Sequence, residues 1–164
     1  MVKLTIDGQK IEVKEGLTIL EVAKQLNIEI PTLCYHEALS PYGACRLCIV
    51  EIIKDGKREL KSSCSYPVQE GMVVETSSER VIRTRKMIIE LLLASCPGSK
   101  KIQDLAKQMN ITKVRFETED KECILCGLCV RVCDELMKLG AINFFNRGSK
   151  TEVTTPFKKF SEVC

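Results

Sequence analysis

Alternating apolar and polar residues dominate the first part of the chain. Residues 2–13 read VKLTIDGQKIEV, two alternating runs on either side of Asp7-Gly8, and this pattern predicts a β-hairpin. Residues 18–28, TILEVAKQLNI, change to helical spacing, and Thr18 with Glu21 forms a capping-box pattern at the start of the predicted helix.

The strand pattern returns after a long irregular stretch at residues 30–46. LCIVEII predicts a strand, Asp55-Gly56 a turn and RELKSSC its antiparallel partner, while MVVETS predicts a closing strand. Strand, strand and helix followed by further strands are the order of a β-grasp domain. We therefore predict an α+β protein whose first domain, residues 1–76, is a β-grasp domain.

Helical periodicity dominates the middle of the chain. Thr76 with Glu79 predicts the start of a helix that runs to about Ser95, and Cys96-Pro97-Gly98 ends it. A shorter amphipathic helix is predicted to end near Asn110. Residues 77–112 are thus expected to form a helical linker before a third section, residues 113–164.

Composition adds one outlier, because 10 of the 164 residues are cysteine. Disulfides, zinc and iron–sulfur clusters all use many cysteines. The N-terminus carries no export signal, and the longest apolar run is interrupted by Glu90, so we expect a cytoplasmic chain without direct membrane insertion. Cytoplasmic thiols stay reduced, which favours metal over disulfides. A net charge of +3 without a basic, aromatic-interleaved stripe predicts no nucleic-acid partner.

Four cysteines in the first half, Cys34, Cys45, Cys48 and Cys64, follow the spacing C-x10-C-x2-C-x15-C. Four thiolates suit a [2Fe–2S] cluster, with two sulfurs for each iron. The C-x2-C pair can hold one iron from a tight turn while the more distant cysteines take the remaining positions. A structural zinc site more often shows two C-x2-C pairs or histidine partners. The only histidine, His36, is interpreted as a loop-packing residue rather than a ligand.

The segment PTLCYHEALSPYGACRLCIVE, residues 31–51, resembles the N-terminal [2Fe–2S] domain of a known family. That family includes the large iron–sulfur subunit of respiratory complex I, [FeFe]-hydrogenases, and diaphorase iron–sulfur subunits of NAD-linked hydrogenases and formate dehydrogenases. By this resemblance, which covers about the first 75 residues, the four cysteines above are the cluster ligands. Many relatives carry a His/Cys3 [4Fe–4S] motif next. Here only Cys96 remains in that stretch, so we expect this cluster to be absent and Cys96 to be buried.

A second group of cysteines, Cys123, Cys126, Cys129 and Cys133, has the bacterial ferredoxin spacing C-x2-C-x2-C-x3-C. Three of them can hold three corners of a [4Fe–4S] cluster, and Gly127 eases a close backbone approach. KECILCGLCVRVCDEL resembles the first half of the family's two-cluster module, and Cys164 resembles the first cysteine of a second run.

Two interpretations of the last two cysteines stay open. The chain is a shortened piece in which Cys133 and Cys164 both belong to a second [4Fe–4S] cluster, or it holds one such cluster with Cys133 or Cys164 as the fourth ligand. We favour the first, a [4Fe–4S] ferredoxin-like module over residues 113–164 that is truncated at its C-terminus.

No pattern in the sequence indicates a catalytic nucleophile or a dinucleotide-binding loop, so we predict a non-catalytic electron-transfer subunit of an oxidoreductase. The resemblance implies two kinds of partner. One is a flavoprotein or NAD(P)H-oxidising subunit, and the other is a hydrogenase, formate dehydrogenase or heterodisulfide-reductase-like subunit, in a redox complex of an anaerobe. The alternatives are a freestanding ferredoxin-type electron shuttle and a zinc-stabilised interaction module.

Overall fold

The computed structural model describes residues 1–163, so the candidate ligand Cys164 lies outside the described residues. The predicted strands of the first section form one five-stranded sheet in the order β2-β1-β5-β3-β4. Its strands are β1 (Val2–Ile6), β2 (Gln9–Val13), β3 (Ile49–Lys54), β4 (Lys57–Ser62) and β5 (Val73–Glu75). Neighbouring strands are antiparallel except β1 and β5, which are parallel. The chain is therefore α+β and begins with a mixed sheet.

The two hairpins and the helix of this section form where the Asp-Gly turns and the capping box of the sequence predict them. Asp7-Gly8 and Asp55-Gly56 all have positive φ, from 46° to 81°, as a two-residue hairpin turn requires. Helix α1 (Ile19–Gln25) begins at Thr18, whose side chain accepts the N–H of Glu21, and the Glu21 carboxylate accepts the Thr18 N–H in return. The predicted capping box is confirmed.

Two helices follow the sheet, α2 (Glu79–Ser95) and α3 (Lys100–Gln108). The prediction that Thr76 caps α2 is wrong, because Ser78 is the N-cap and its hydroxyl accepts the N–H of Val81 at 3.3 Å. Thr76 still belongs to the sheet region, where its N–H donates to the Asp7 carboxylate at 2.7 Å. The Asp7 carboxylate, in the first hairpin turn, thus accepts hydrogen bonds from the backbone N–H and the hydroxyl of Thr76, the groups that a cap at Thr76 would have used. The break at Cys96 and the shorter second helix are confirmed.

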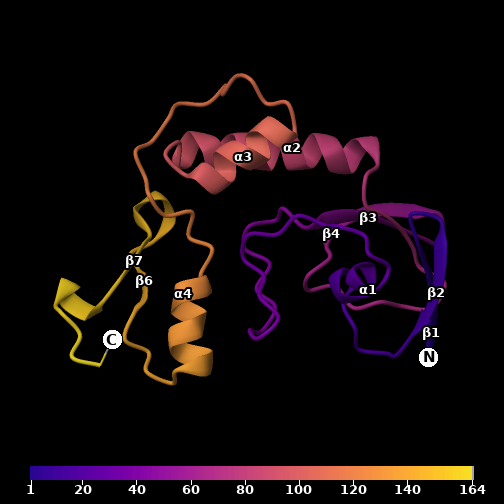
Figure 1. The fold of residues 1–164 in the computed structure, drawn as a ribbon, viewed down its shortest axis with the longest axis horizontal. Helices are drawn as coiled ribbons and strands as arrows, with labels where there is room; N and C mark the ends of the chain where they lie inside the picture. Colours follow the sequence, from indigo (N-terminus) through magenta and orange to yellow (C-terminus); the bar gives the residue numbers. More distant parts are fainter. Residues whose placement is uncertain (164) are drawn as a thin grey trace.

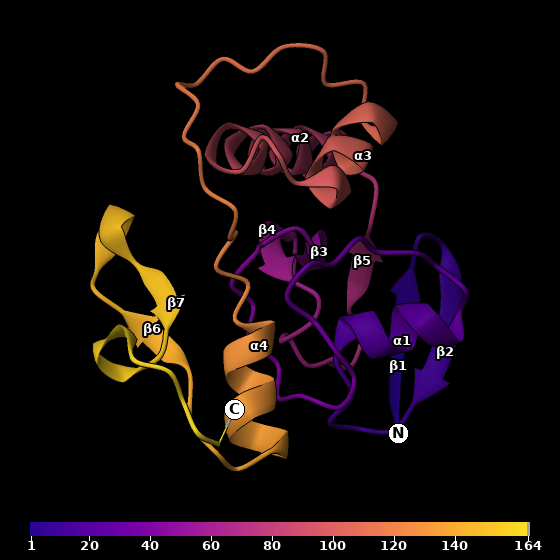
Figure 2. The same cartoon turned by 60° about the vertical axis from the view of Figure 1, so that its left-hand side comes forward.

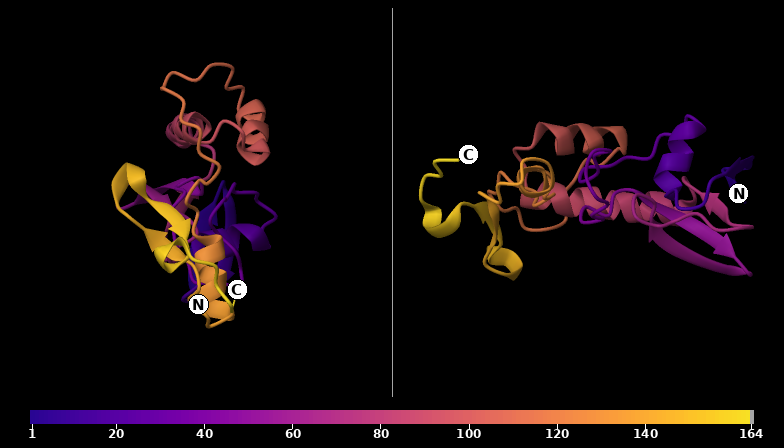
Figure 3. Two further views of the ribbon diagram at one scale, coloured as in Figure 1. Left: turned by 90° about the vertical axis from the view of Figure 1, so that its left-hand side faces the viewer. Right: turned by 90° about the horizontal axis from the view of Figure 1, so that it is seen from below.

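The cysteine-rich last section is mostly irregular. Its helix α4 (Leu128–Arg131) continues into a π-helical turn, η1 (Val132–Leu136), and a small hairpin pairs β6 (Asn143–Phe145) with β7 (Glu152–Thr154). Two short 3₁₀ turns, η2 (Gly148–Lys150) and η3 (Pro156–Lys158), complete it. Figure 1 shows α2 and α3 above both the sheet and this last section. The N-terminus lies in the sheet at one end of the long axis, and the C-terminal segment lies at the other end (Figures 1 and 3).

Two separate hydrophobic cores hold these parts together. The first lies between the sheet and α1, and it includes Cys48 and Cys64. The second lies between α2 and α3, and its fully buried members include Leu47, Ile89 and Ile102. Because Leu47 and Cys48 are neighbours in sequence, the two cores meet at the cysteine-bearing loop. Among the helices of residues 1–163, none has the length and apolar character needed to cross a membrane.

Candidate metal centre

The structure brings together the four cysteines of the first group. The sulfur of Cys34 lies 3.4 Å from that of Cys45, and the sulfur of Cys48 lies 3.3 Å from that of Cys64. Cys34, Cys48 and Cys64 are each about 1% exposed. The C-x2-C cysteines are therefore divided between two close sulfur pairs. This differs from the expectation that Cys45 and Cys48 act together on one iron, because each of them approaches a cysteine distant in the sequence.

The loop that carries these cysteines is anchored on both sides. Cys48 packs in the core between the sheet and α1, whereas Leu47 is fully buried and Cys45 partly buried in the core between α2 and α3. Consecutive residues of the loop therefore face opposite cores. Such anchoring limits the movement of the sulfurs before any ligand binds, which is what a preorganised metal site needs.

Local backbone conformation completes the arrangement. Gly43 has φ 71°, and Arg46, which lies between Cys45 and Cys48 in the sequence, has φ 58°. A residue with a Cβ pays about 1–2 kcal/mol for this left-handed conformation, and such strain concentrates at functional sites. The Cys45 N–H lies 3.4 Å from the Cys34 sulfur and points to it. The buried Ser63 hydroxyl donates to the Cys48 carbonyl at 2.8 Å.

The contact within each sulfur pair shifts the two pKa values of that pair in opposite directions. The pKa of Cys45 falls to about 5 because its sulfur accepts a hydrogen bond from Cys34, whose own pKa is raised well above the usual range. The contact with Cys64 lowers the pKa of Cys48, and the same contact together with burial raises the pKa of Cys64. The contacts within each pair thus favour the thiolate at one of the two sulfurs, and the thiolate is the form that binds metals.

Two buried arginines reach this loop from helices outside the sheet. Arg85 of α2 donates from Nε to the Leu47 carbonyl at 3.2 Å and from Nη2 to the Ile49 carbonyl at 2.7 Å. Arg131 of α4 donates to the Cys34 carbonyl at 2.8 Å and to the Ser40 carbonyl at 2.6 Å. Burial lowers the pKa of Arg85, and the nearby Cys48 sulfur opposes that change.

The sequence interpretation missed both arginines, although each carried a signal. Arg85 stands on the buried face of α2 with Val81 and Ile89, where helical spacing calls for an apolar residue. Arg131 stands between two valines in the run CVRVC.

The second group of cysteines is arranged differently. Cys123 and Cys129 are exposed, Cys126 is partly buried, and Cys133 is buried with its sulfur accepting the Ala141 N–H at 3.1 Å. Leu125 and Gly127 have φ 54° and 73°, so the loop turns sharply on both sides of Cys126. Within residues 1–163, no three cysteine, histidine, aspartate or glutamate side chains converge on a single metal-ion position.

The two cysteine regions contact each other through aromatic and charged side chains. The Arg131 guanidinium lies 5.1 Å from the centroid of the Tyr42 ring, and Tyr42 stacks on Phe144 with 6.5 Å between ring centroids. The Glu135 carboxylate accepts the Ser40 N–H at 2.7 Å. A Cβ at Gly127 would lie 3.0 Å from Tyr42, so this position needs glycine for space as well as for φ. Figure 2 shows α4 beside the loop of residues 30–46.

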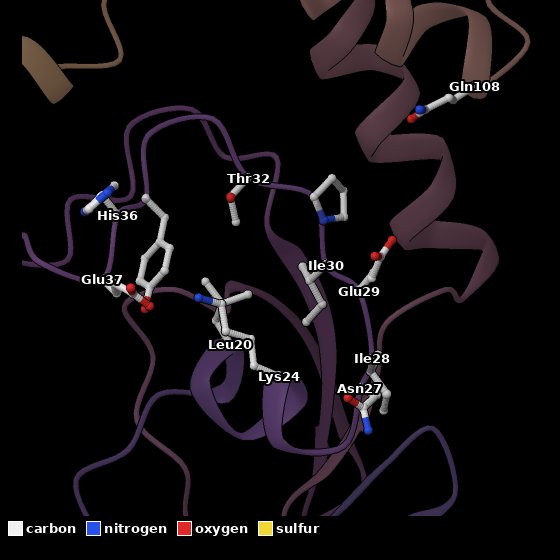
Figure 4. Close-up of a pocket in the computed structure, with 12 residues that line it drawn as sticks. Leu20, Lys24, Asn27, Ile28, Glu29, Ile30, Thr32, His36, Glu37 and Gln108 are labelled. Carbon is white, nitrogen blue, oxygen red and sulfur yellow. The ribbon is translucent and has the colours of Figure 1, made fainter.

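A cleft of about 780 Å³ lies on the other side of the same loop, between α1 and the segment that follows it. Figure 4 shows Leu20 and Lys24 of α1, His36 of the loop and Gln108 of α3 around it. None of the residues that line it is a cysteine. His36 accepts the Ala38 N–H at 3.2 Å, which agrees with its interpretation as a loop residue.

The donor set fits a two-iron cluster. Two sulfur pairs, with 3.4 and 3.3 Å between their sulfurs, lie on one loop and the strand end beside it, and a [2Fe–2S] cluster takes two cysteine sulfurs on each iron. Within the described residues no sulfur–sulfur hydrogen bond joins two cysteines of the second group, and in neither group do three side chains converge on a single ion position.

Comparison with known proteins agrees with this interpretation. Residues 1–79 match the family model described as a 2Fe-2S iron-sulfur cluster binding domain. The NADP-reducing hydrogenase subunit HndD of Solidesulfovibrio fructosivorans is 35% identical over 188 residues, and the NADH-ubiquinone oxidoreductase 75 kDa subunit of Reclinomonas americana is 35% identical over 184 residues. These matches cover 96% and 97% of this chain, but the chain spans only 32% and 26% of the two relatives.

A solved structure extends the similarity to three dimensions. The crystal structure of an NAD+-reducing [NiFe]-hydrogenase in the H2-reduced state matches with a TM-score of 0.80 and 31% identity, covering 94% of this chain and 74% of that chain. The chain therefore belongs to the family of iron–sulfur proteins, with an N-terminal 2Fe-2S cluster binding domain, that includes the NADP-reducing hydrogenase subunit HndD, the 75 kDa subunit of NADH-ubiquinone oxidoreductase and the NAD+-reducing [NiFe]-hydrogenase.

Proposed function

We propose that this chain carries electrons through a [2Fe–2S] cluster bound by Cys34, Cys45, Cys48 and Cys64 in a β-grasp domain over residues 1–76. The observation that carries the proposal is the pair of close sulfur contacts, 3.4 and 3.3 Å, inside a segment that matches a 2Fe-2S domain. When bound, such a cluster takes up and releases one electron. The protein supplies a loop that is anchored in two hydrophobic cores and buries three of the four cysteines.

The proposal includes a second cluster in residues 113–164, after a helical linker over residues 77–112. Cys123, Cys126 and Cys129 would hold three corners of a [4Fe–4S] cluster. The C-x2-C-x2-C spacing supports this assignment, and the left-handed backbone at Leu125 and Gly127 turns the chain sharply on both sides of Cys126. Cys133 or Cys164 would be the fourth ligand, or both would serve a further [4Fe–4S] cluster.

The contact between the two cysteine regions supports a relay. Arg131, two residues after Cys129, donates directly to the carbonyl of Cys34, so the two proposed clusters belong to parts of the molecule that touch. Electrons would pass from one cluster to the other without a bond being made or broken. The proposed role is therefore that of a non-catalytic electron-transfer subunit.

The proposed partners follow from the names of the relatives. Their names include NADH-ubiquinone oxidoreductase and NADP-reducing hydrogenase, and the similar crystal structure is that of an NAD+-reducing hydrogenase. We infer that one side of this chain meets a flavin- or NAD(P)H-handling subunit. The other side would meet a hydrogenase, formate dehydrogenase or heterodisulfide-reductase-like subunit. A cytoplasmic location and an anaerobic source stay predictions.

The decisive experiment measures iron and acid-labile sulfide per chain, together with EPR spectra, in protein purified without oxygen. Cys48→Ser should remove the [2Fe–2S] signal and leave the signal of the second cluster. Cys96→Ser is the matched control for the first cluster, because Cys96 is equally buried but its charged neighbours are Glu119, Lys121 and Cys123 of the last section, and it should leave the [2Fe–2S] signal unchanged. Colourless wild-type protein with one divalent ion per chain would rule out the proposal.

The number of irons per chain distinguishes a chain with one [4Fe–4S] cluster from a chain with two. About six irons per chain would mean one [2Fe–2S] and one [4Fe–4S] cluster, and about ten would mean a further [4Fe–4S] cluster. Co-purification of a tagged chain tests the partner assignment. A monomer that elutes alone but reduces and reoxidises reversibly would favour a freestanding ferredoxin-type shuttle.

A further inference from the structure

Arg85 is a buried charge in an unexpected place. Its side chain occupies the apolar face of α2, four residues after Val81 and four before Ile89, and the residue is only 7% exposed. Removing a charged group from water is costly unless it is paired or hydrogen-bonded. Arginine keeps its proton in proteins, so the guanidinium brings its positive charge into the interior.

The partners of Arg85 are neutral. Its two hydrogen bonds go to the carbonyls of Leu47 and Ile49, which flank Cys48. No ion pair within 4.0 Å involves Arg85 in the described part of the chain, whereas the other buried arginine, Arg131, has the Glu135 carboxylate at 3.3 Å. In the described part of the chain no carboxylate therefore contacts Arg85, although Asp7 is near enough to raise its pKa, and the charge lies beside one of the four cysteines of the candidate metal centre.

We propose that Arg85 is a positioning residue that raises the reduction potential of the [2Fe–2S] cluster, and this inference rests on the proposed function. A [2Fe–2S] cluster with four thiolates is a dianion when oxidised and a trianion when reduced. A buried positive charge stabilises the trianion more than the dianion, because charges interact strongly where water is excluded. Local charge and hydrogen bonding are established means of tuning such clusters.

The same contacts also fix the position of Cys48. The guanidinium is a rigid planar fork, and its two bonds hold the peptide groups on both sides of Cys48 against α2. The side chain therefore links the helix that leads to the second cysteine region with the loop of the first. Arg131 makes similar bonds at Cys34, but its charge is offset by Glu135, so its effect on the potential should be smaller.

The test is an EPR-monitored redox titration of the [2Fe–2S] cluster in the full chain. Arg85→Met removes the positive charge and the hydrogen-bond donors of the guanidinium while keeping a side chain of similar volume. It should lower the equilibrium constant for one-electron reduction about tenfold, which is a fall of about 59 mV in the midpoint potential. Arg85→Lys keeps the charge and should shift the constant less than threefold. Arg83→Met, an exposed position on the same helix, removes the same charge and should leave the constant unchanged.

Each result of the redox titration supports or contradicts the role of the Arg85 charge. An unchanged potential in Arg85→Met, or an equal fall in Arg85→Met and Arg85→Lys, would overturn the inference, because the charge would not be its cause. Should Arg85→Met fail to retain the cluster, Arg85→Gln decides, since glutamine still donates to a carbonyl but carries no charge. Wild-type protein without a [2Fe–2S] signal would contradict the proposed function itself, a result that differs from a cluster with an insensitive potential.

Discussion

The two cysteine regions of this molecule reach their geometry in different ways. In the first, Cys34, Cys48 and Cys64 are about 1% exposed, and their loop is packed between two hydrophobic cores. In the second, Cys123 and Cys129 are exposed on a mostly irregular segment whose sharp turns are local. Packing of elements that are distant in the sequence preorganises the first site. The second site is determined mainly by the close spacing of its cysteines and by the local backbone conformation.

The contact between the regions makes this difference testable. Arg131 and Glu135 extend from the second region to the loop of the first, and Gly127 fits against Tyr42. Changes in the cores should therefore disturb the first site more than the second, changes at the contact should affect how the regions are joined, and changes on the surface of α2 should have smaller effects.

The largest effect is expected from Leu47→Ala. This fully buried leucine anchors the cysteine loop in the core between α2 and α3, so its truncation should cost about 2–5 kcal/mol of unfolding free energy. It should weaken the EPR signal of the proposed [2Fe–2S] cluster more than that of the proposed second cluster. Denaturant unfolding under nitrogen measures the loss. Leu91→Ala, at a position 48% exposed on α2, should change stability by no more than about 0.5 kcal/mol.

The next effect concerns the contact itself. Gly127→Ala would place a Cβ 3.0 Å from Tyr42 and 3.2 Å from Phe144 at φ 73°, and should cost about 2–4 kcal/mol in urea unfolding. Gly140→Ala meets nothing within 4 Å at φ 58°, so it should cost only the conformational part, about 1–2 kcal/mol. Equal costs for the two variants would show that the ring contact contributes nothing.

A smaller, pH-dependent effect is expected from Glu90→Gln. The Arg115 guanidinium and N–H donate to the Glu90 carboxylate, which joins α2 to the segment before the second cysteine group and lowers the pKa of that carboxyl. Because the pKa of Glu90 is lower in the folded protein than its ordinary value of about 4.3, the ion pair stabilises the fold at pH values above 4.3. This stabilisation is lost as the pH falls through the pKa of Glu90 in the folded protein.

The melting temperature of the wild type should therefore exceed that of Glu90→Gln at pH 7 by a gap that holds down to about pH 4.3 and narrows as the pH falls towards about 3. Calorimetry across this pH range checks it, with the exposed Glu122→Gln as the control. A gap that stays constant across the range would contradict the role of this ion pair.

The smallest effect is expected at the start of α2. Ser78→Ala removes the hydroxyl that accepts the Val81 N–H and should cost about 1 kcal/mol of stability. Ser77→Ala, at an exposed neighbouring position, should cost no more than about 0.5 kcal/mol. Thermal unfolding of the two variants side by side measures the difference, and a larger loss in Ser77→Ala would contradict the observed cap.

Local patterns in the sequence were sufficient to predict most of the elements. The two Asp-Gly turns, the capping box at Thr18 and the helix break at Cys96 all depend on residues close together in the chain, and the structure confirms them. The start of α2 was misplaced because Thr76 is used by Asp7, a residue 69 positions away, which no local pattern records.

The sequence by itself determined which residues can serve as ligands, because the spacing of cysteines and the chemistry of thiolates are written in the chain. Only the tertiary structure decided which sulfurs lie together, dividing Cys45 from Cys48, and which charges surround them. Arg131 contacts Cys34 across 97 positions, and Arg85 reaches Leu47 across 38. Such contacts arise when separate elements pack, since folding places distant residues by the burial of whole surfaces and not by their order in the sequence.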